Sequence, residues 1–231
     1  MSSPDWFDDE RDGPRISGNV TALLTELAVT ADRRSLPDAT ELRRWHTRLY
    51  GGVVAPVPGY IGHFRGDTGI PELATFDVGI GDPLPDGLPE KVGLWAEEVD
   101  GAVDQLLDLL HSALRDLDER LPVGVRPTVA EDLVAVVELA ARAHGEWVRI
   151  HPYVNGNGRT ARLWVAFVCL RYGLPVLVAV KPRPDGDPYA RASQRSMGRP
   201  PQFRGDHGPT VALFARLLVE QLSGGRSRTG R

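Results

Sequence analysis

Twelve consecutive residues carry the side chains of this chain that are best suited to chemistry. They run from His151 to Arg162 and read His-Pro-Tyr-Val-Asn-Gly-Asn-Gly-Arg-Thr-Ala-Arg. The imidazole of His151 can accept a proton near neutral pH, because its ordinary pKa is about 6.5. Arg159 and Arg162 are three residues apart and share one face of a helical turn. Two guanidinium groups placed there are suited to phosphate oxygens.

The glycines in this segment indicate that its backbone approaches a ligand. Gly156 and Gly158 allow close approach and permit a positive φ. A helix that begins near Gly158 would add the positive end of its dipole and its unpaired N–H groups, which attract anions. Taken singly, each residue type is more often structural, since histidines, paired arginines and Gly-Asn-Gly turns are common. Their conjunction ahead of an apolar helix favours a phosphate-binding catalytic loop.

Hydrophobic periodicity predicts a mainly helical protein around this loop. The helices are expected at about residues 20–32, 38–50, 89–120, 128–150, 158–172 and 209–222. Pro37-Asp38 introduces the second, Gly51-Gly52 closes it, and Thr128 with Glu131 offers a capping box for the fourth. Residues 53–88 are rich in glycine and proline, and the strand candidates Tyr60–Arg65 and Ala74–Ile80 predict a surface hairpin or flap. Residues 1–17 and 223–231 read as a flexible arm and tail, which leaves one domain at 18–222.

Composition excludes several classes of protein. Hydrophobic content of 42%, charged content of 25% and a net charge of −4 are typical of a soluble globular domain with no nucleic-acid partner. The most apolar stretch, 163–180, contains Arg171, Gly173 and Pro175 and is no membrane helix of about 20 residues. The first residues do not form a signal peptide, so we expect a cytoplasmic protein.

The single cysteine, Cys169, cannot form an internal disulfide and is expected to be a small buried hydrophobe. His63, His144 and His207 do not make a convincing zinc set with it, so no structural metal is predicted.

The segment closely resembles the signature of the Fic-domain (Fic/Doc) family, His-x-Phe-x-(Asp/Glu)-Gly-Asn-Gly-Arg-x-x-Arg. Weaker similarity lies at Trp45–Tyr50, Gly62–Arg65 and Leu170–Pro175, so the resemblance covers roughly residues 40–222. It implies the Fic fold: mainly α, a helical bundle with a small β-hairpin flap over the active-site loop. It also implies a protein adenylyltransferase that moves AMP from ATP to a Ser, Thr or Tyr hydroxyl of a target protein.

The resemblance assigns roles residue by residue. His151 is the general base that takes the proton of the attacking hydroxyl. The donor phosphates lie in an anion hole that is lined by residues 155–158, namely Asn155, Gly156, Asn157 and Gly158. Arg159 and Arg162 hold the β- and γ-phosphates. The flap holds an extended target segment by main-chain pairing, through the residues Thr75, Phe76, Asp77 and Val78.

One departure from the signature concerns the metal. Asn155 stands where the family has Asp or Glu, a carboxylate that helps to bind Mg²⁺ across the donor phosphates. Hard cations favour charged oxygen ligands, so we expect weak Mg²⁺ binding at Asn155 and slower turnover. Tyr153 in place of the signature Phe is a milder change, because its ring can still anchor the loop in the core.

Two alternatives stay open. A Fic-fold transferase could use another donor, such as UMP, GMP or phosphocholine, and Asn155 could mark a nucleotide- or protein-binding module without catalysis. The intact Gly-Asn-Gly-Arg argues against γ-phosphoryl transfer.

Regulation is a separate question. Many family members carry an inhibitory Ser/Thr-x-x-x-Glu-Gly/Asn helix, and the sole Ser/Thr-x-x-x-Glu spacing here, Thr68 to Glu72, contains Pro71 and is read as chance. An inhibitor is therefore expected from a separate antitoxin-like partner, in keeping with a bacterial toxin or regulator.

Overall fold

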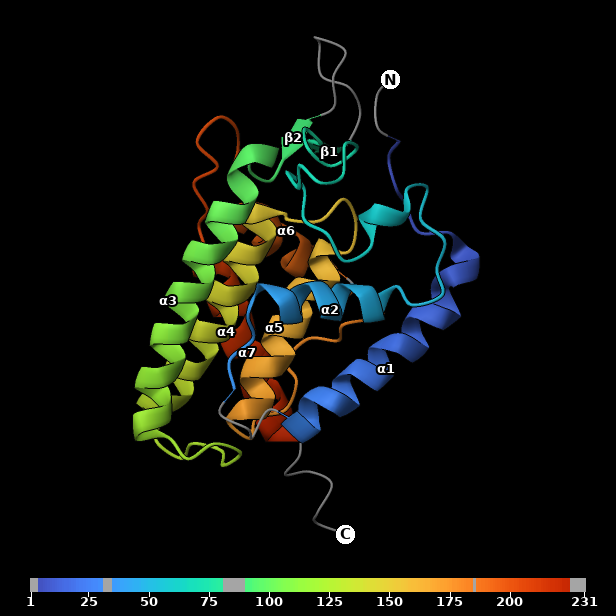
Figure 1. Ribbon diagram of the computed structural model, residues 1–231. Coiled ribbons are helices and arrows are strands. Elements are labelled where there is room, and N and C mark those ends of the chain that lie inside the picture. The colour runs from blue at the N-terminus through green and yellow to red at the C-terminus, as the bar shows by residue number, and fades with distance from the viewer. Residues whose placement is uncertain (1–3, 31–34, 81–89, 185, 225–231) are drawn as a thin grey trace.

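The computed structural model describes residues 4–30, 35–80, 90–184 and 186–224 (Figure 1). Helices dominate, and the one sheet found in these ranges is a two-stranded antiparallel hairpin in which Val78 pairs with Val92. The α-helices are α1 (Gly13–Thr30), α2 (Ala39–Leu49), α3 (Val99–Arg120), α4 (Ala130–Ile150), α5 (Asn157–Arg171), α6 (Asp187–Met197) and α7 (Gly208–Gly224). The strands are β1 (Val78–Ile80) and β2 (Glu90–Val92), and the 3-10 turns are η1 (Glu10–Asp12), η2 (Pro58–Tyr60) and η3 (Ala96–Glu98).

Helices α4 and α5 form the centre of the molecule. Helix α4 packs against α3, α5, α6 and α7, while α5 also packs against α1 and α2. Figure 1 shows α3 and α4 running side by side and the hairpin at one end of this bundle. The loop between α4 and α5 lies at the same end as the hairpin, because the hairpin is hydrogen-bonded to it: the N–H of Leu94, just after β2, donates to the carbonyl of Ile150 at 3.2 Å.

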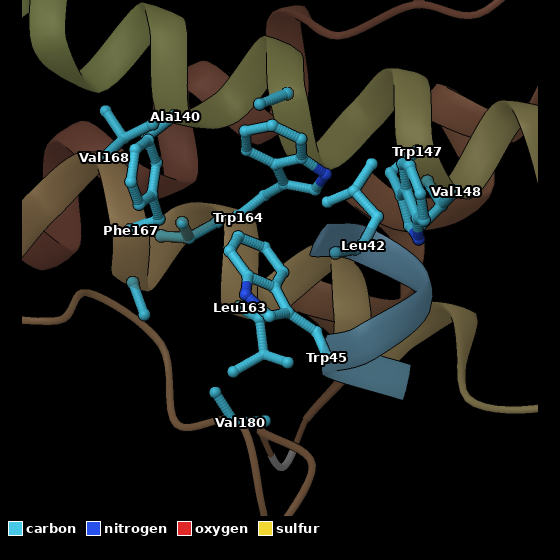
Figure 2. Packing of buried hydrophobic residues seen from close by; sticks show 14 of the residues in the cluster. Leu42, Trp45, Ala140, Trp147, Val148, Leu163, Trp164, Phe167, Val168 and Val180 are labelled. Atoms are coloured by element: carbon cyan, nitrogen blue, oxygen red, sulfur yellow. The ribbon is translucent and has the colours of Figure 1, made fainter. Parts of the chain in front are cut away.

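The sequence of α5 explains its central place. Residues 163–169 of this helix, Leu-Trp-Val-Ala-Phe-Val-Cys, are all buried, so the helix is apolar on every side. Figure 2 shows the packing around Trp164, whose ring meets that of Trp45 from α2 edge-on with centroids 5.6 Å apart. Each fully buried side chain of this size contributes about 1.5–3 kcal/mol through the hydrophobic effect. Cys169 is buried as expected, and burial raises the pKa of its thiol to about 12.

Several predicted helices are confirmed where local signals were strong. Helix α2 lies within the predicted 38–50, and the Asp38 carboxylate caps it by accepting the N–H of Glu41 at 2.8 Å. Helices α5 and α7 match 158–172 and 209–222 to within two residues. Helix α4 ends at Ile150 as predicted, but Val129 is its first flanking residue, and the Thr128 side chain does not cap it. None of the helices described here is long and apolar enough to cross a membrane.

Other predictions were wrong. Residues 60–65 form no strand: η2 ends at Tyr60, and turns follow. The partner of β1 is instead β2, which lies within the helix predicted from residue 89, so α3 begins only at Val99. The Ala74–Ile80 candidate is a strand only from Val78. Helix α6 was not predicted, because it is short and carries several polar residues between glycines. The segment that joins β1 to β2 and the tail 225–231 lie outside the described residues.

The N-terminal arm predicted at 1–17 needs correction. Helix α1 begins at Gly13 rather than near residue 20, and η1 precedes it. Before η1, Trp6 is buried, with its ring centroid 4.6 Å from that of Tyr50. The hydroxyl of Tyr60 also donates to the carbonyl of Pro4 at 2.9 Å. The arm is therefore tied to the domain by an aromatic side chain that composition alone did not flag.

Candidate active site

The loop between α4 and α5 is built on two left-handed residues. His151 ends α4 with φ of 55°, and Gly156 begins α5 with φ of 87°. A Cβ at Gly156 would lie 2.7 Å from the ring of Tyr50 and 3.2 Å from Nε2 of His46, so both conformation and space require glycine. Gly158 lies inside the first turn of α5 and has no positive φ, contrary to the expectation from sequence.

A buried histidine from α2 supports the middle of the loop. Nδ1 of His46 accepts the N–H of Gly62 at 2.9 Å, so its proton lies on Nε2, which donates to the carbonyl of Asn155 at 3.0 Å. The same ring stacks on Tyr153 with centroids 3.8 Å apart. Tyr153 is buried, as predicted, and its hydroxyl donates to the carbonyl of Leu42 at 2.8 Å. Burial lowers the pKa of His46 to about 3, which keeps this arrangement uncharged.

Asn157 closes the loop on itself. Its amide oxygen accepts the N–H of Tyr153 at 2.8 Å, and its amide nitrogen donates to the carbonyl of the same residue at 2.7 Å. These paired bonds fix the chain between the histidine and α5. The side chain of Asn157 is therefore committed to loop structure, although the residue lies at the wall of the cavity.

His151 is held as a neutral imidazole with a free ring nitrogen. Its Nδ1 lies 3.3 Å from the carbonyl oxygen of Val148, and because a carbonyl can only accept, the proton lies on Nδ1. Burial, together with the nearby charges of Arg65 and Lys91, lowers the pKa of His151 to about 3. At neutral pH the unprotonated Nε2 can therefore accept a proton.

Arg162 is a buried cation with neutral partners. Its Nε and Nη2 donate to the carbonyl of Val180 at 3.1 and 2.9 Å, and Nη1 donates to the hydroxyl of Tyr189 at 3.0 Å. That hydroxyl lies 2.8 Å from Nε2 of His144, whose pKa burial lowers to about 3. Within the described ranges, no carboxylate is paired with Arg162, which is only 4% exposed. A buried charge without a counterion favours an anionic ligand.

Arg159, three residues earlier, is paired with a carboxylate from the other end of the chain. Its guanidinium forms an ion pair with Asp8 and also donates to the hydroxyl of Tyr50. Asp8 in turn accepts the amide N–H of Asn155 at 2.8 Å, while the amide oxygen of Asn155 accepts the N–H of Gly156 at 2.7 Å. One carboxylate thus joins the residue that departs from the signature to the first signature arginine.

A cavity of about 480 Å³ gathers these groups. Every residue predicted for catalysis or phosphate binding lines it, namely His151, Asn155, Gly156, Asn157, Gly158, Arg159 and Arg162. The imidazole and the first turn of α5 therefore face one space, which is large enough for a nucleotide or another small ligand. Tyr189 and Ser193 of α6 form part of its wall.

The four predicted hairpin residues lie in different settings. Phe76 and Val78 line the cavity, and Phe76 is buried. Thr75 is exposed and is not part of the cavity wall. Asp77 forms an ion pair with Lys91 of β2, and its carboxylate accepts the N–H of Ala96 at 3.1 Å. Only Val78 belongs to a strand, so the edge available for pairing begins later than predicted.

Several residues of the cavity wall were not predicted from the sequence. Lys181 and Arg183 add positive charge to the wall, Trp6 and Phe7 come from the N-terminal segment, and Tyr189 comes from α6. Burial and the neighbouring Arg159 both lower the pKa of Lys181. The Lys-Pro-Arg-Pro run at 181–184 was a basic signal that could have been noticed. The contacts of Asp8 and Tyr189 had no local signal, because they depend on the tertiary fold.

The residues present fit Mg²⁺ poorly. Among the described residues, no group of three or more His, Cys, Asp or Glu side chains could hold a metal ion. The oxygen of Asn155 already accepts a main-chain N–H, and Asp8, the carboxylate that the Asn155 amide contacts, is bound to Arg159. Hard cations prefer several free oxygen ligands.

Comparison with curated proteins finds adenylyltransferases. A segment of 70 residues is 36% identical to "Protein adenylyltransferase Fic" of Nematostella vectensis and covers 30% of this chain and 16% of that protein. A segment of 45 residues is 47% identical to the protein of the same name from Drosophila melanogaster and covers 20% of this chain and 9% of that protein. The chain thus matches less than a fifth of the length of these relatives.

Comparison with solved structures finds the same fold. A Fic-domain-containing signaling protein from Bacteroides thetaiotaomicron superposes with a TM-score of 0.63 at 18% identity, over 94% of this chain and 73% of that one. The N-terminal Fic domain of a VirB-translocated effector from a Bartonella species gives 0.50 at 15% identity, over 89% and 85%. A sequence profile of the Fic/DOC family matches residues 37–169, more than half of the chain. The chain therefore belongs to the Fic/DOC family.

Proposed function

We propose that this protein transfers AMP from ATP to a Ser, Thr or Tyr hydroxyl of a target protein. One observation carries the proposal: the free Nε2 of a neutral His151 and the arginines of the first turn of α5 line the same cavity. A proton acceptor beside a phosphate-binding site can promote the attack of a hydroxyl group on phosphorus. The relatives named adenylyltransferases support AMP as the transferred group.

The reaction balances with the groups at hand. The target oxygen forms a bond to the α-phosphorus, the bond between that phosphorus and the oxygen bridging to the β-phosphate breaks, and pyrophosphate leaves. The proton of the hydroxyl goes to Nε2 of His151. A bound triphosphate raises the pKa of this imidazole from its low value in the free protein, because negative charge nearby favours the protonated form. Proton transfer by a positioned base typically contributes about 10²–10⁴-fold.

The phosphate end relies on electrostatic stabilisation. Arg162 presents a charge whose partners in the described part of the chain are neutral. The start of α5 presents its dipole, and Lys181 and Arg183 add charge at the wall. The pyrophosphate leaving group is placed here, next to Arg162 and Arg159. Phosphoryl-type transfer depends mostly on such positioning and charge neutralisation.

The hairpin residues 75–78 are assigned to docking of the target, with the edge of β1 from Val78 offering main-chain pairing.

An alternative, a Fic-fold transferase with another nucleotide or phosphocholine as its donor, uses the same groups. In our proposal the protein works in the cytoplasm, uses ATP as its donor, and has a separate antitoxin-like protein as its inhibitor. That inhibitor is tested by adding such a partner to the purified protein, which should then lose AMP transfer.

A second candidate function rests on a specific contact. Because Asp8 occupies Arg159 and bonds to Asn155, the protein could bind a nucleotide weakly without transferring it. Nucleotide binding without any protein-bound label is the result that this candidate predicts.

The position of a radioactive label decides between these functions. The protein is incubated with a lysate and with ATP labelled at the α- or the γ-phosphate, and protein-bound label is followed. We expect α-label to be retained and γ-label to be lost, with His151→Ala abolishing retention. His63→Ala is the matched control, since His63 lies outside the cavity wall and is partly exposed. Retention of γ-label alone means phosphorylation and contradicts AMP transfer.

A further inference from the structure

Arg65 is a buried guanidinium that donates hydrogen bonds to four main-chain carbonyls. Its side chain is fully buried. Nε donates to the carbonyl of His151 at 2.8 Å, and Nη2 donates to that of Ile150 at 3.1 Å. Nη1 donates to Phe76 at 3.0 Å, and Nη2 also donates to Leu94 at 3.0 Å. These four hydrogen bonds join residues 76 and 94 to residues 150 and 151, which lie far away in the sequence.

These four carbonyls belong to the hairpin and to the catalytic loop. Phe76 lies just before β1, and Leu94 lies just after β2, so Arg65 holds both bases of the hairpin. The other two carbonyls are those of the last residue of α4 and of His151 itself. The backbone N–H of Arg65 adds a bond to the carbonyl of Pro152 at 2.7 Å. One side chain therefore joins the hairpin to the residue that carries the imidazole.

We propose that Arg65 is a positioning residue that fixes the hairpin relative to His151, and thereby sets where an acceptor hydroxyl docked on the hairpin meets Nε2. The inference rests on the proposed function, because it takes His151 as the base and the hairpin as the docking element. It adds a residue to which no role in transfer has been assigned. Among the described residues, Arg65 forms no hydrogen bond or ion pair with Arg159 or Arg162.

The backbone of His151 and of Gly93 shows how close the hairpin and the catalytic loop lie. His151 adopts the left-handed conformation, which is uncommon for a residue with a side chain, and the bond from Nε of Arg65 to its carbonyl supports it. Gly93, just after β2, also has a positive φ of 74°. A Cβ there would lie 2.3 Å from Cβ of His151 and 3.1 Å from Nη2 of Arg65. The base of the hairpin thus lies directly against the imidazole-bearing residue.

The charge of Arg65 gives a second, separable effect. The charged side chains that act on His151 are Arg65 and Lys91, and both lower the pKa of its imidazole beyond the effect of burial. Asp77 lies 3.5 Å from Arg65 and is ion-paired with Lys91. A lysine at position 65 keeps the cation but lacks the fork of donors, whereas a methionine removes both.

The test compares Arg65→Lys and Arg65→Met with a matched control, Arg171→Lys. Arg171 is also an arginine with no side-chain exposure, but it lies at the far end of α5 and pairs with Asp118. Four quantities are measured: kcat for AMP transfer, the Kd of a non-hydrolysable ATP analogue, and the tautomer and the pKa of His151 by ¹⁵N NMR. Hydrogen exchange of the hairpin amides reports directly whether the hairpin has come loose.

Arg65→Lys is expected to lower kcat about 100-fold, since misplacement of reacting groups by about 1 Å has that effect. The analogue should bind with a Kd within about threefold of wild type, because Arg65 shares no hydrogen-bond partner with Arg159 or Arg162. The Nδ1–H tautomer of His151 should give way to a mixture, and hairpin amides should exchange faster. Arg65→Met should in addition raise the pKa of His151, while Arg171→Lys should change none of these.

Several results would overturn the inference. An unchanged kcat and tautomer in folded Arg65→Lys, or a loss of analogue affinity equal to the loss of kcat, contradicts a positioning role. If neither Arg65 variant folds, Gly93→Ala tests the same junction, and unchanged kcat and hairpin exchange there contradict it. Failure of the proposed function is distinguishable: wild-type protein then transfers no AMP, while tautomer and hydrogen exchange still report on Arg65.

Discussion

Arg159 and Arg162 stand three residues apart in the first turn of α5, yet their charges are handled in opposite ways. Arg159 is paired with the carboxylate of Asp8 and is partly accessible. Arg162 is almost fully buried and, among the residues that the structure describes, donates to the carbonyl of Val180 and the hydroxyl of Tyr189 alone. A buried cation with neutral partners gains most from an anionic ligand, whereas a cation that already has a carboxylate must exchange it.

The difference teaches that the two signature arginines are not equivalent in the free protein. If Arg162 binds phosphate as proposed, it is preorganised for that role, because its hydrogen bonds to Val180 and Tyr189 fix its position before the ligand arrives. Arg159 becomes available only when Asp8 moves away or shares it. The phosphate chain is therefore expected to gain most of its binding energy from Arg162, with a smaller contribution from Arg159. Four predictions test this difference, from the largest effect to the smallest.

Arg162→Met should weaken binding of a non-hydrolysable ATP analogue by about 100-fold, whereas Arg159→Met should weaken it by less than about tenfold. Hydrogen bonds to a charged group contribute about 1.5–3 kcal/mol, and Arg159 must first give up a carboxylate. Isothermal titration calorimetry measures both values, and thermal unfolding checks that each variant is folded. Equal losses for the two variants would contradict the difference between the arginines.

Acid should destabilise the surroundings of Arg162. The pKa of His144 is lowered to about 3 by burial and by Arg162, so the unfolded chain takes up a proton first as pH falls below about 6.5. Its contribution to stability is therefore complete above about pH 6.5 and declines towards pH 3, by up to about 1.4 kcal/mol per pH unit. Urea unfolding between about pH 7 and pH 4.5 measures the slope. His144→Gln should reduce the slope and His63→Gln should not; identical slopes would refute this account.

Asp8→Asn should tighten binding of the ATP analogue by about tenfold. The substitution removes the carboxylate that competes with phosphate for Arg159, in a partly exposed ion pair whose strength is moderated by solvent. Asp9→Asn is the control, because the neighbouring Asp9 pairs with Arg11 instead. Weaker binding in Asp8→Asn would mean that this carboxylate belongs to the nucleotide site and replaces the acid absent at position 155.

Asn155→Asp should give the smallest change, a gain of about threefold in affinity that requires magnesium. The new carboxylate would stand where an amide now donates to Asp8 at 2.8 Å, and it would offer a charged oxygen to a cation. Titrations of the analogue with and without magnesium measure the effect. The same gain in the absence of magnesium would contradict a role for the cation.

The part of this site that could be predicted from sequence is the part encoded locally. Gly156 lies at the positive φ that its type suggested, Asp38 caps α2, and the apolar run of α5 is buried as its pattern indicated. These features depend on neighbouring residues, on backbone conformation and on hydrophobic periodicity. The choice of loop, base and arginines followed from such short-range signals together with the family signature.

The rest depends on contacts between distant residues. The Asp8–Arg159 pair joins positions 151 residues apart, and nothing near Asp8 in the sequence indicates a partner. Trp6 lies in a polar segment of the sequence, which gives no sign that its side chain is buried. Residues 60–65 form no strand, because β1 pairs with β2 instead. Short strands are specified by what pairs with them, so propensity alone could not choose between these segments.

The most direct test of the central claim is a crystal structure of the protein with a non-hydrolysable ATP analogue. The account predicts that the β- and γ-phosphates lie beside Arg162 at the start of α5. It also predicts that the α-phosphorus faces the place, next to Nε2 of His151, where the hydroxyl of the target protein would bind. It also predicts that Asp8 has left Arg159. A nucleotide bound with its phosphates away from Arg162, or with the α-phosphorus out of reach of His151, would contradict it.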